Sequence, residues 1–253
     1  MADAARAATL RYFRSADLST DSKDATGYDP VTQADRASEA AMRAVLKARR
    51  PEDGILGEEE SAKPGTSGLT WVIDPIDGTR GFVAGTPSWG VLIALQADAG
   101  PIYGLIDQPY IGERFEGGFG RAEMHGPMGS RALGVRAHRP LSRATLFTTF
   151  PEIGTTLERS AFERVRDRVL LTRYGLDCYA YALLAAGHVD LIIEAGLQSY
   201  DIAAPIAVIE AAGGIVTDWS GGPAYGGGRA LAAASPELHN AALALLQGAQ
   251  DLA

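Results

Sequence analysis

Apolar positions near the start of the chain recur at the spacing of an amphipathic helix. Segments 4–16 and 33–49 are predicted to be helices, and apolar positions from Ala37 to Val45 form one face of the second. The polar segment 19–30 between them contains glycine, proline and several charged residues. Its composition suits either a loop that closes over a ligand or a simple linker.

Short apolar runs bounded by glycine or proline follow in the middle of the chain. Segments 71–73, 89–95, 102–106 and 114–119 are rich in β-favouring residues, so each is predicted to be a strand. Short turns join the last three segments along the chain. This pattern predicts an antiparallel meander.

From residue 144 onward, helical and strand-like segments alternate. The predicted strands are 146–150, 189–194 and 230–234, and the predicted helices are 156–169, 178–186, 202–212 and 236–247. Alternation of this kind is typical of layered α/β packing. The change of pattern places a boundary near Pro140, so we expect an α+β domain over 1–140 and an α/β domain over 141–253.

The size and charge of the chain limit the classes of partner. The chain has 253 residues, of which 46% are hydrophobic, enough for one large domain or two closely packed ones. The net charge of −8 is spread without long runs of like charge, which argues against a nucleic-acid partner. An anionic substrate would meet an unfavourable overall field, so metal ions and a few specific donors would have to neutralise it locally.

Cysteine usage and the first residues indicate the compartment. Cys178 is the only cysteine, which excludes an intrachain disulfide and a zinc site made of several thiolates. The four histidines are scattered and form no paired ligand motif. Segment 1–14 lacks the apolar core of a signal peptide, and no apolar run is long enough for a membrane span. We therefore expect a cytoplasmic protein without a membrane partner.

Segment 71–79 carries the clearest chemical signal in the chain. It reads WVIDPIDGT and places two carboxylates three residues apart, directly after an apolar strand-like run. Pro75 bends the backbone at the strand end, so Asp74 and Asp77 are expected to face a cleft. Carboxylate and carbonyl oxygens suit Mg²⁺, Ca²⁺ or Mn²⁺, and the fixed φ of Pro75 lets these acids converge with the Ile76 carbonyl.

The end of the same segment offers a seat for an anion. Gly78 and Thr79 present backbone N–H groups where a helix could begin, which suits a phosphate. Aspartate, proline and glycine at a strand end are also ordinary turn residues. The presence of further acids near this turn would therefore favour a binding site over a plain turn.

Three further acids are candidates for the same site, and each has a simpler interpretation. Glu58 follows the apolar pair at 55–56 and could end a short strand, but runs of glutamate are often solvated surface. Asp35 begins the second predicted helix, where an acid also favours the helix dipole. Asp201 precedes the helix at 202–212, where aspartate is a good N-cap.

Taken together, four motifs resemble those of one known family. In chain order they are DPVTQAD at 29–35, GEE at 57–59, WVIDPIDGT at 71–79 and YDIAA at 200–204. Their order and approximate spacing are similar to those of the inositol monophosphatase family, over nearly the whole chain. The resemblance implies an α/β fold, a layered αβαβα sandwich, and a magnesium-dependent, lithium-sensitive phosphomonoesterase.

The resemblance also implies roles for particular residues. The metal ligands would be Glu58, Asp74, the Ile76 carbonyl, Asp77 and Asp201. Asp74 would bridge two of two or three Mg²⁺ ions, while Asp35 and the Thr79 hydroxyl would orient and help deprotonate the attacking water. The amides of Gly78 and Thr79 would hold phosphate oxygens.

Paired cations suit this chemistry independently of the family name. A phosphate monoester dianion repels hydroxide, so cations must neutralise it, lower the pKa of water and stabilise the leaving oxygen. No cysteine or histidine nucleophile is indicated by the sequence. We therefore expect direct hydrolysis without a phosphoenzyme.

Residues outside the shared motifs narrow the substrate. RGFVAG at 80–85, PSWG at 87–90, YGLDCY at 174–179 and GHVDL at 187–191 resemble the histidinol-phosphate phosphatase branch of the family. Asp177 occupies a position that is typically small and neutral in the inositol branch.

An acidic pocket suits histidinol phosphate, which carries an ammonium group near its ester oxygen. Asp177 and Glu194 would offer charge-assisted hydrogen bonds to this amine, and Arg173 could contact phosphate or pair with one of the acids. Asp177 could instead cap the helix at 178–186, and Arg80 could be only an ion-pair partner. The expected substrate contacts are Ile76, Asp77, Gly78, Thr79, Arg80, Arg173, Asp177, Glu194 and Asp201.

The functional hypothesis is a phosphoric monoester hydrolase that converts L-histidinol phosphate to L-histidinol and phosphate in histidine biosynthesis. Inositol monophosphatase or broader sugar and nucleotide phosphatase activity is the alternative within the same fold. A non-catalytic metal-binding module is the alternative of a different class. The family suggests a homodimer whose partner is a small phosphate monoester, not nucleic acid.

Overall fold

The computed structural model describes residues 1–16, 18–22 and 30–248 of the chain. The predicted loop over 19–30 falls largely on residues 23–29, which lie outside the described residues. The segments on either side of it, β1 (Thr20–Ser22) and β2 (Pro30–Thr32), pair as antiparallel strands.

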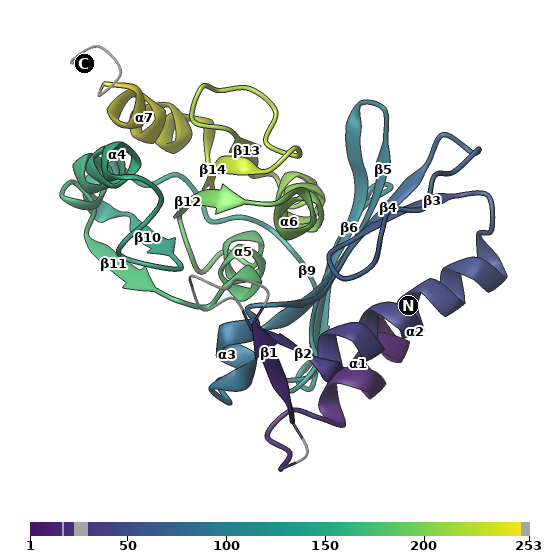
Figure 1. The fold of residues 1–253 in the computed structure, drawn as a ribbon. Helices are drawn as coiled ribbons and strands as arrows, with labels where there is room; N and C mark the ends of the chain where they lie inside the picture. The colour runs from purple at the N-terminus through teal and green to yellow at the C-terminus, as the bar shows by residue number, and fades with distance from the viewer. Residues whose placement is uncertain (17, 23–29, 249–253) are drawn as a thin grey trace.

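A seven-stranded sheet forms the first half of the molecule (Figure 1). Its strands, in both spatial and chain order, are β3 (Gly54–Gly57), β4 (Thr70–Asp77), β5 (Gly90–Ala97), β6 (Gly100–Gln108), β7 (Glu113–Gly118), β8 (Arg121–Gly126) and β9 (Gly129–Ala132). β3 and β4 are parallel, and every later neighbouring pair is antiparallel. The predicted meander is therefore confirmed.

A five-stranded sheet forms the second half, in the spatial order β11-β10-β12-β14-β13. The strands are β10 (Thr145–Thr148), β11 (Leu171–Tyr174), β12 (Leu191–Leu197), β13 (Ile215–Thr217) and β14 (Gly228–Ala233). β10 is parallel to both β11 and β12, whereas β14 is antiparallel to its two neighbours.

Helices cover and separate the two sheets. They are α1 (Ala2–Leu10), α2 (Gln33–Arg49), α3 (Thr79–Val83), α4 (Thr156–Arg166), α5 (Cys178–Ala185), α6 (Ser199–Ala211) and α7 (Pro236–Gln247), with a short 3-10 helix at Leu141–Arg143. In Figure 1, α1 and α2 lie outside the first sheet, α5 and α6 lie between the sheets, and α4 and α7 lie outside the second. The predicted αβαβα sandwich is therefore confirmed.

The layers follow from the two-residue period of the strands. Ile73, Val91 and Ile93 face α1 and α2, while their neighbours Val72 and Leu92 face α5 and α6. Because both faces of the sheet are covered, the strands read as continuous apolar runs. The inner core joins residues from both sheets.

α6 lies unusually close to the first sheet, and this closeness fixes the position of its first turn. A Cβ atom added to Gly104 would lie 2.3 Å from the Ala204 carbonyl oxygen. One added to Gly117 would lie 2.5 Å from the Cα atom of Val208. Glycine on β6 and β7 therefore lets the helix backbone rest directly on the strands.

Several boundaries differ from the sequence pattern. α1 ends at Leu10, earlier than the predicted end at residue 16, because the chain turns to bring Phe13 onto Phe82 and Trp89, with ring centroids 5.2 Å apart in both pairs. α6 begins at Ser199 rather than at residue 202. α3 begins at Thr79, where the sequence indicated that a helix could begin. The pattern missed the short strands β1, β2, β8, β9, β11 and β13.

The two sheets occupy separate stretches of chain, since the first ends at Ala132 and the second starts at Thr145. The division into two domains near Pro140 stays a prediction, as do the homodimer and the cytoplasmic location. None of the helices in the described part of the chain has the length and apolar character that a membrane span needs.

Candidate active site

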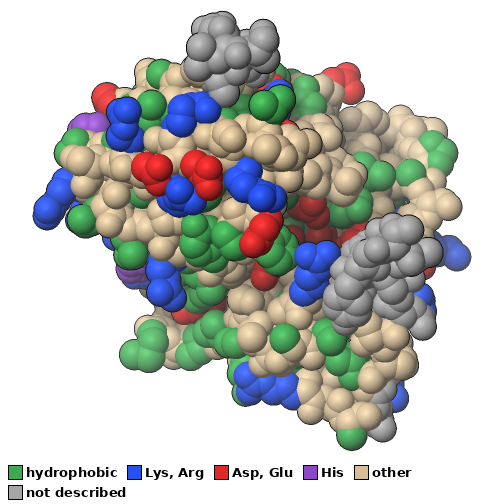
Figure 2. All heavy atoms as spheres, turned by 60° about the vertical axis from the view of Figure 1, so that its left-hand side comes forward, with side chains coloured by type: hydrophobic (Ala, Val, Ile, Leu, Met, Phe, Trp, Pro, Cys, Tyr) green, Lys and Arg blue, Asp and Glu red, His purple; other side chains and the backbone are tan. Residues whose placement is uncertain are grey.

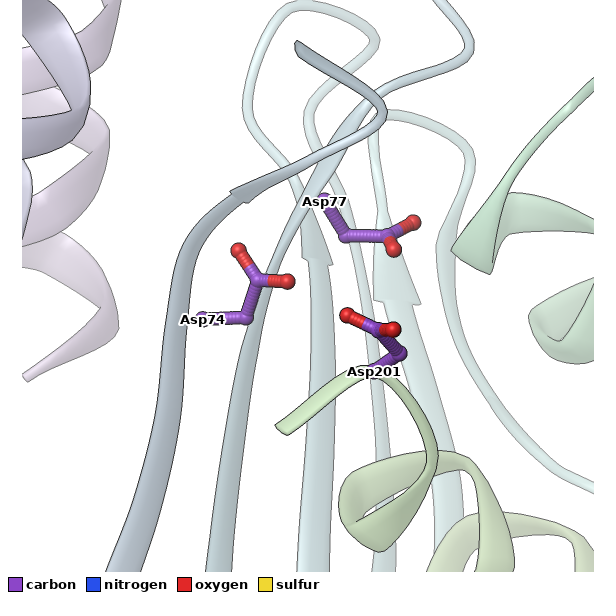
Figure 3. Close-up of side chains that lie close together, drawn as sticks. All are labelled: Asp74, Asp77 and Asp201. Carbon is purple, nitrogen blue, oxygen red and sulfur yellow. The ribbon is translucent and has the colours of Figure 1, made fainter. Parts of the chain in front are cut away.

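Three predicted metal ligands meet between the bent end of β4 and the first turn of α6. Asp74, Asp77 and Asp201 each offer a carboxylate oxygen, and these oxygens all lie within 4.8 Å of one another. Figure 3 shows Asp74 and Asp77 on β4 and Asp201 on α6, with their carboxylates gathered in the space between the two elements. The strand pairing slips between Asp74 and Asp77, which turns both acids toward this space.

A backbone amide orients each of these carboxylates. Asp74 Oδ1 accepts a hydrogen bond from the Ile76 N–H at 3.0 Å, and Asp77 Oδ2 accepts one from the N–H of Cys178. Asp201 Oδ2 accepts one from the Gln198 N–H at 2.7 Å, as the third residue of a capping box. Asp201 thus lies inside the helix rather than at its N-cap.

The cluster is electrostatically costly. Burial raises the pKa of Asp74 well above its usual range, and the charges of Glu58, Asp77 and Asp201 raise it further. Burial also raises the pKa of Asp77, followed by the charges of Asp177 and Asp201. Buried like charges disfavour one another unless a cation joins them. A set of carboxylates, with a nearby carbonyl, is the donor chemistry that hard divalent cations prefer, so these residues fit such ions.

A cavity of about 370 Å³ contains the cluster. Figure 2 shows acidic side chains in a hollow on one face of the molecule. The residues that line the cavity are Glu58, Asp74, Ile76, Asp77, Gly78, Thr79, Arg80, Phe150, Asp177, Gly196, Gln198, Tyr200 and Asp201. The structure therefore brings all five predicted metal ligands to one cavity.

The predicted water-activating pair lies beside this cavity. Asp35 is buried, and its Oδ2 accepts hydrogen bonds from the Thr32 N–H at 2.8 Å and the Thr32 hydroxyl at 2.6 Å. Its Oδ1 lies 3.4 Å from the Thr79 hydroxyl, which is also 3.1 Å from the Ile76 carbonyl oxygen. Asp35 thus closes the capping box of α2 and also reaches the β4 turn. Burial raises the pKa of Asp35 to about 6, although the Thr32 hydrogen bonds oppose this rise.

Glu39 supports the loop that carries Glu58, and sequence reasoning missed it. Its carboxylate is fully buried and accepts hydrogen bonds from the Glu59 N–H at 2.8 Å and the Glu60 N–H at 3.1 Å. It also pairs with Arg43, with Nε 2.8 Å from Oε1. An acid on the inward face of α2, four residues before an arginine, was the signal available in the sequence.

Asp177 occupies a strained position at the cavity wall. Leu176 and Asp177 have φ values of 79° and 46°, which side-chain-bearing residues rarely adopt. Asp177 stands at the N-cap of α5, the position that the simpler interpretation gave it, but its side chain makes no capping hydrogen bond there. Its Oδ2 lies 3.5 Å from the Ser88 hydroxyl instead. Burial raises the pKa of Asp177 to about 6, with Ser88 and Arg80 opposing.

Gly78 makes room for Asp177 at the turn. Its φ is +84°, and an added Cβ atom would lie 2.7 Å from the Asp177 Cγ atom. Glycine is therefore required here both by the backbone conformation and by the close approach of the acid.

The remaining predicted contacts, Glu194 and Arg173, occupy two different places. Glu194 is buried on β12, where it accepts hydrogen bonds from the Thr149 N–H at 2.7 Å, the Thr149 hydroxyl at 2.9 Å and the Thr148 hydroxyl at 3.1 Å. Burial raises its pKa to about 7. It lines a neighbouring cavity of about 300 Å³ together with Arg80. Arg173 is exposed on β11 and lines neither cavity, so the structure does not bring it to the site.

Four further residues line the main cavity although the sequence assigned them no role there: Phe150, Gly196, Gln198 and Tyr200. Phe150 comes from the loop after β10, and Arg80 lies over its ring, with 5.1 Å between the guanidinium carbon and the ring centroid. Phe150 ends a predicted strand and the other three residues fall between predicted elements, so only the folded chain shows that they meet at the site.

The chain matches known proteins along nearly its whole length. A family model described as the inositol monophosphatase family matches residues 1–251. The chain is 44% identical over 223 residues to an Arabidopsis thaliana protein named bifunctional phosphatase IMPL2, chloroplastic, with 87% of this chain and 63% of that protein covered. It is 37% identical over 261 residues to a Streptomyces coelicolor protein named histidinol-phosphatase, with 97% of this chain and 94% of that protein covered.

The fold also matches a solved structure of an inositol monophosphatase from Zymomonas mobilis. The TM-score is 0.85 at 39% sequence identity, with 97% of this chain and 94% of that chain covered. The likeness therefore extends from the sequence motifs to the complete arrangement of layers.

Proposed function

We propose that this chain, which belongs to the inositol monophosphatase family of phosphatases, cleaves the ester L-histidinol phosphate to L-histidinol and phosphate. The observation that carries this proposal is a pair of acids beyond the metal-ligand set, the half-buried Asp177 and the buried Glu194. Asp177 lines the carboxylate cavity, and Glu194 lines the cavity beside it. An ammonium-bearing alcohol would offer both acids a positively charged hydrogen-bond donor, whereas an uncharged polyol would offer them none.

Divalent cations complete the proposed site. Members of the family are metal-dependent, and we assign two or three Mg²⁺ ions to Glu58, Asp74, the Ile76 carbonyl, Asp77 and Asp201. When bound, the ions supply positive charge to the phosphate oxygens, lower the pKa of the attacking water and favour departure of the ester oxygen.

Residues of the chain position the attacking water and the phosphate. The Thr79 hydroxyl donates to Asp35, which leaves its oxygen lone pairs free to accept a hydrogen bond from water. One proton of the attacking water passes by way of the Thr79 hydroxyl to the ionised Asp35 while the water oxygen bonds to phosphorus and the ester P–O bond breaks. The leaving alkoxide takes a proton from solvent water, and Asp35 returns its proton to solvent. The N–H groups of Gly78 and Thr79 hold phosphate oxygens at the start of α3.

Acids on the opposite side hold the alcohol portion. In their ionised forms, Asp177 and Glu194 accept hydrogen bonds from the substrate ammonium. Arg80 lines both the carboxylate cavity and the neighbouring cavity that contains Glu194, where its charge can contact a phosphate oxygen. Inositol monophosphate is the second candidate substrate, favoured by the 39% identity to the Zymomonas mobilis inositol monophosphatase.

Phosphate release from two esters tests the substrate. With Mg²⁺, we expect kcat/KM for L-histidinol phosphate to exceed that for myo-inositol 1-phosphate by about a hundredfold, since a site built for a hydrogen-bonding group rejects analogues that lack it. The Asp177→Asn variant should narrow this ratio, while Asp98→Asn, which changes an exposed aspartate, should preserve it. Equal or reversed rates in the unmodified protein would rule out the histidinol assignment.

A further inference from the structure

A second cavity of about 540 Å³ adjoins the carboxylate cavity. The two share Arg80, Phe150 and Asp177. The other residues that line the second cavity are Gly81, Thr86, Pro87, Ser88, Ile111, Thr149, Tyr174, Gly175, Leu176 and Tyr179. Family resemblance assigned none of these others a role.

The chemistry of the second cavity is opposite to that of the first. Pro87, Ile111, Leu176 and the rings of Tyr174 and Tyr179 supply most of its wall, and Asp177 is its only acid. The Tyr179 hydroxyl donates to Glu113, so the polar end of this side chain is already occupied. Aromatic and aliphatic walls of this kind favour the faces of a flat ring, and the hydroxyls of Ser88 and Tyr174, which also line the cavity, can pair with polar atoms at the edge of that ring.

Hydrogen bonds fix the walls of the cavity relative to one another. Gln108 is fully buried, and its Nε2 donates to the carbonyl oxygens of Pro87 at 3.1 Å and Trp89 at 3.0 Å. Its Oε1 accepts from the Ile111 N–H. On the other side, the Gly175 N–H donates to the Thr148 carbonyl oxygen at 3.0 Å. The cavity is therefore formed before a ligand enters, which lowers the entropic cost of binding.

We propose that the second cavity is the subsite for a planar nitrogen heterocycle on the substrate's alcohol portion. This inference rests on the proposed function, because the phosphate must occupy the carboxylate cavity. The order of groups along such a substrate is phosphate, ammonium and ring. In space, the protein presents the metal-ligand carboxylates first, then Asp177 and then the apolar second cavity. The groups of the substrate and the sites that would bind them therefore follow in the same order.

Arg80 and Phe150 stand where the two cavities meet, and both side chains are exposed. Their stacked pair separates the charged part of the site from the apolar part. A ring that reaches the second cavity passes this pair, and the face of Phe150 then becomes one of its contacts.

Removal of one wall tests the subsite through substrate preference. L-Histidinol phosphate and 2-aminoethyl phosphate share the ester and the ammonium group, but only the first carries a ring. We expect Tyr174→Ala to lower the ratio of their kcat/KM values about tenfold, since the loss of an aromatic wall removes apolar contact with the ring. Leu171→Ala is the matched control, because Leu171 is exposed on the same strand and does not line the cavity.

A filled cavity and a direct binding measurement complete the test. Ile111→Trp should exclude the ring and reduce kcat/KM for L-histidinol phosphate while preserving turnover of 2-aminoethyl phosphate. Calorimetry with L-histidinol should show the same order of affinities, unmodified protein above Tyr174→Ala, without any catalytic step. Equal effects of Tyr174→Ala and Leu171→Ala on both measurements would overturn the subsite. Failure of every ester to turn over, with L-histidinol still bound more weakly by Tyr174→Ala, would instead overturn the proposed function and leave the ring subsite standing.

Discussion

The carboxylate cavity and the second cavity share three residues but are built from different kinds of structure. The first takes three of its acids, Asp74, Asp77 and Asp201, from the end of β4 and the first turn of α6, where the backbone is held by a sheet and a helix. The second takes its walls from the segments 86–88 and 174–177 and from the turn at Ile111. Chemistry that requires fixed distances thus lies on regular elements, while ligand selection lies on connecting segments that can vary.

The two cavities also differ in what they cost the fold. Desolvation and mutual repulsion raise the pKa of Asp74 and Asp77. Their ionised side chains therefore destabilise the fold when no cation is bound. The second cavity has apolar walls and a single acid. Changes in the first cavity should therefore alter activity and stability in opposite directions, whereas changes in the second should alter selectivity alone.

Asp74→Asn is the largest expected effect. It should lower kcat/KM about a thousandfold or more, because cations contribute several kcal/mol to this reaction and the bridging charge is lost. The same change should preserve or raise the melting temperature in EDTA, since one buried like charge disappears. Phosphate release and thermal unfolding measure the two effects, with Asp98→Asn as the exposed control. Loss of stability in EDTA would contradict the repulsion that distinguishes this cavity.

Gly78→Ala tests the junction between the cavities and should have a smaller effect. The positive φ alone should cost about 1–2 kcal/mol of unfolding free energy. Gly68→Ala is the matched control, since Gly68 has a φ of +79° and an added Cβ atom would meet nothing within 4 Å. Both variants should lose stability alike, but only Gly78→Ala should displace Asp177 and lower kcat/KM, by about a hundredfold. Equal activity in the two variants would show that the close approach to Asp177 has no role.

Most of the carboxylate cavity could be predicted from the sequence, because several of its residues lie in one short segment. WVIDPIDGT contains the strand, the bend and two acids within nine residues, so periodicity and turn chemistry are enough to place them. Asp201 followed from resemblance, although its helix begins earlier than the apolar pattern indicates. The αβαβα layers followed from the same resemblance, and long apolar strands supported the meander.

The second cavity and Glu39 depend on contacts between distant segments, which no local pattern contains. Glu39 meets the amides of Glu59 and Glu60 only after α2 packs beside β3 and β4. Gln108 joins Pro87 to Ile111 across a turn of the folded sheet. Asp177 is a residue type that commonly caps a helix, but its backbone has an unusual conformation and its side chain makes no capping hydrogen bond.

Glu194 gives the smallest expected effect, and it separates recognition of the amine from the chemistry of the phosphate. Burial raises its pKa to about 7, so the carboxyl is protonated below that pH and ionised above it. The ratio of kcat/KM for 2-aminoethyl phosphate to that for ethyl phosphate should therefore rise about tenfold from about pH 6 to about pH 8, while the amine stays protonated. Ionisation of the metal-ligand acids affects both esters and cancels in the ratio. The ammonium group lowers the phosphate pKa of 2-aminoethyl phosphate, so each rate is expressed per dianion of its ester before the ratio is taken.

Matched variants decide whether Glu194 is the group that titrates. Glu194→Gln keeps an oxygen that can accept hydrogen bonds from Thr149 but cannot ionise, so the ratio should rise far less with pH. Glu237→Gln changes an exposed glutamate on α7 and should reproduce the unmodified rise. A ratio that is independent of pH in the unmodified protein would remove Glu194 from amine recognition and leave Asp177 as the acid that contacts the ammonium. Because Asp177 belongs to both cavities and Glu194 to neither of them, this outcome would also confine selection of the substrate to their junction.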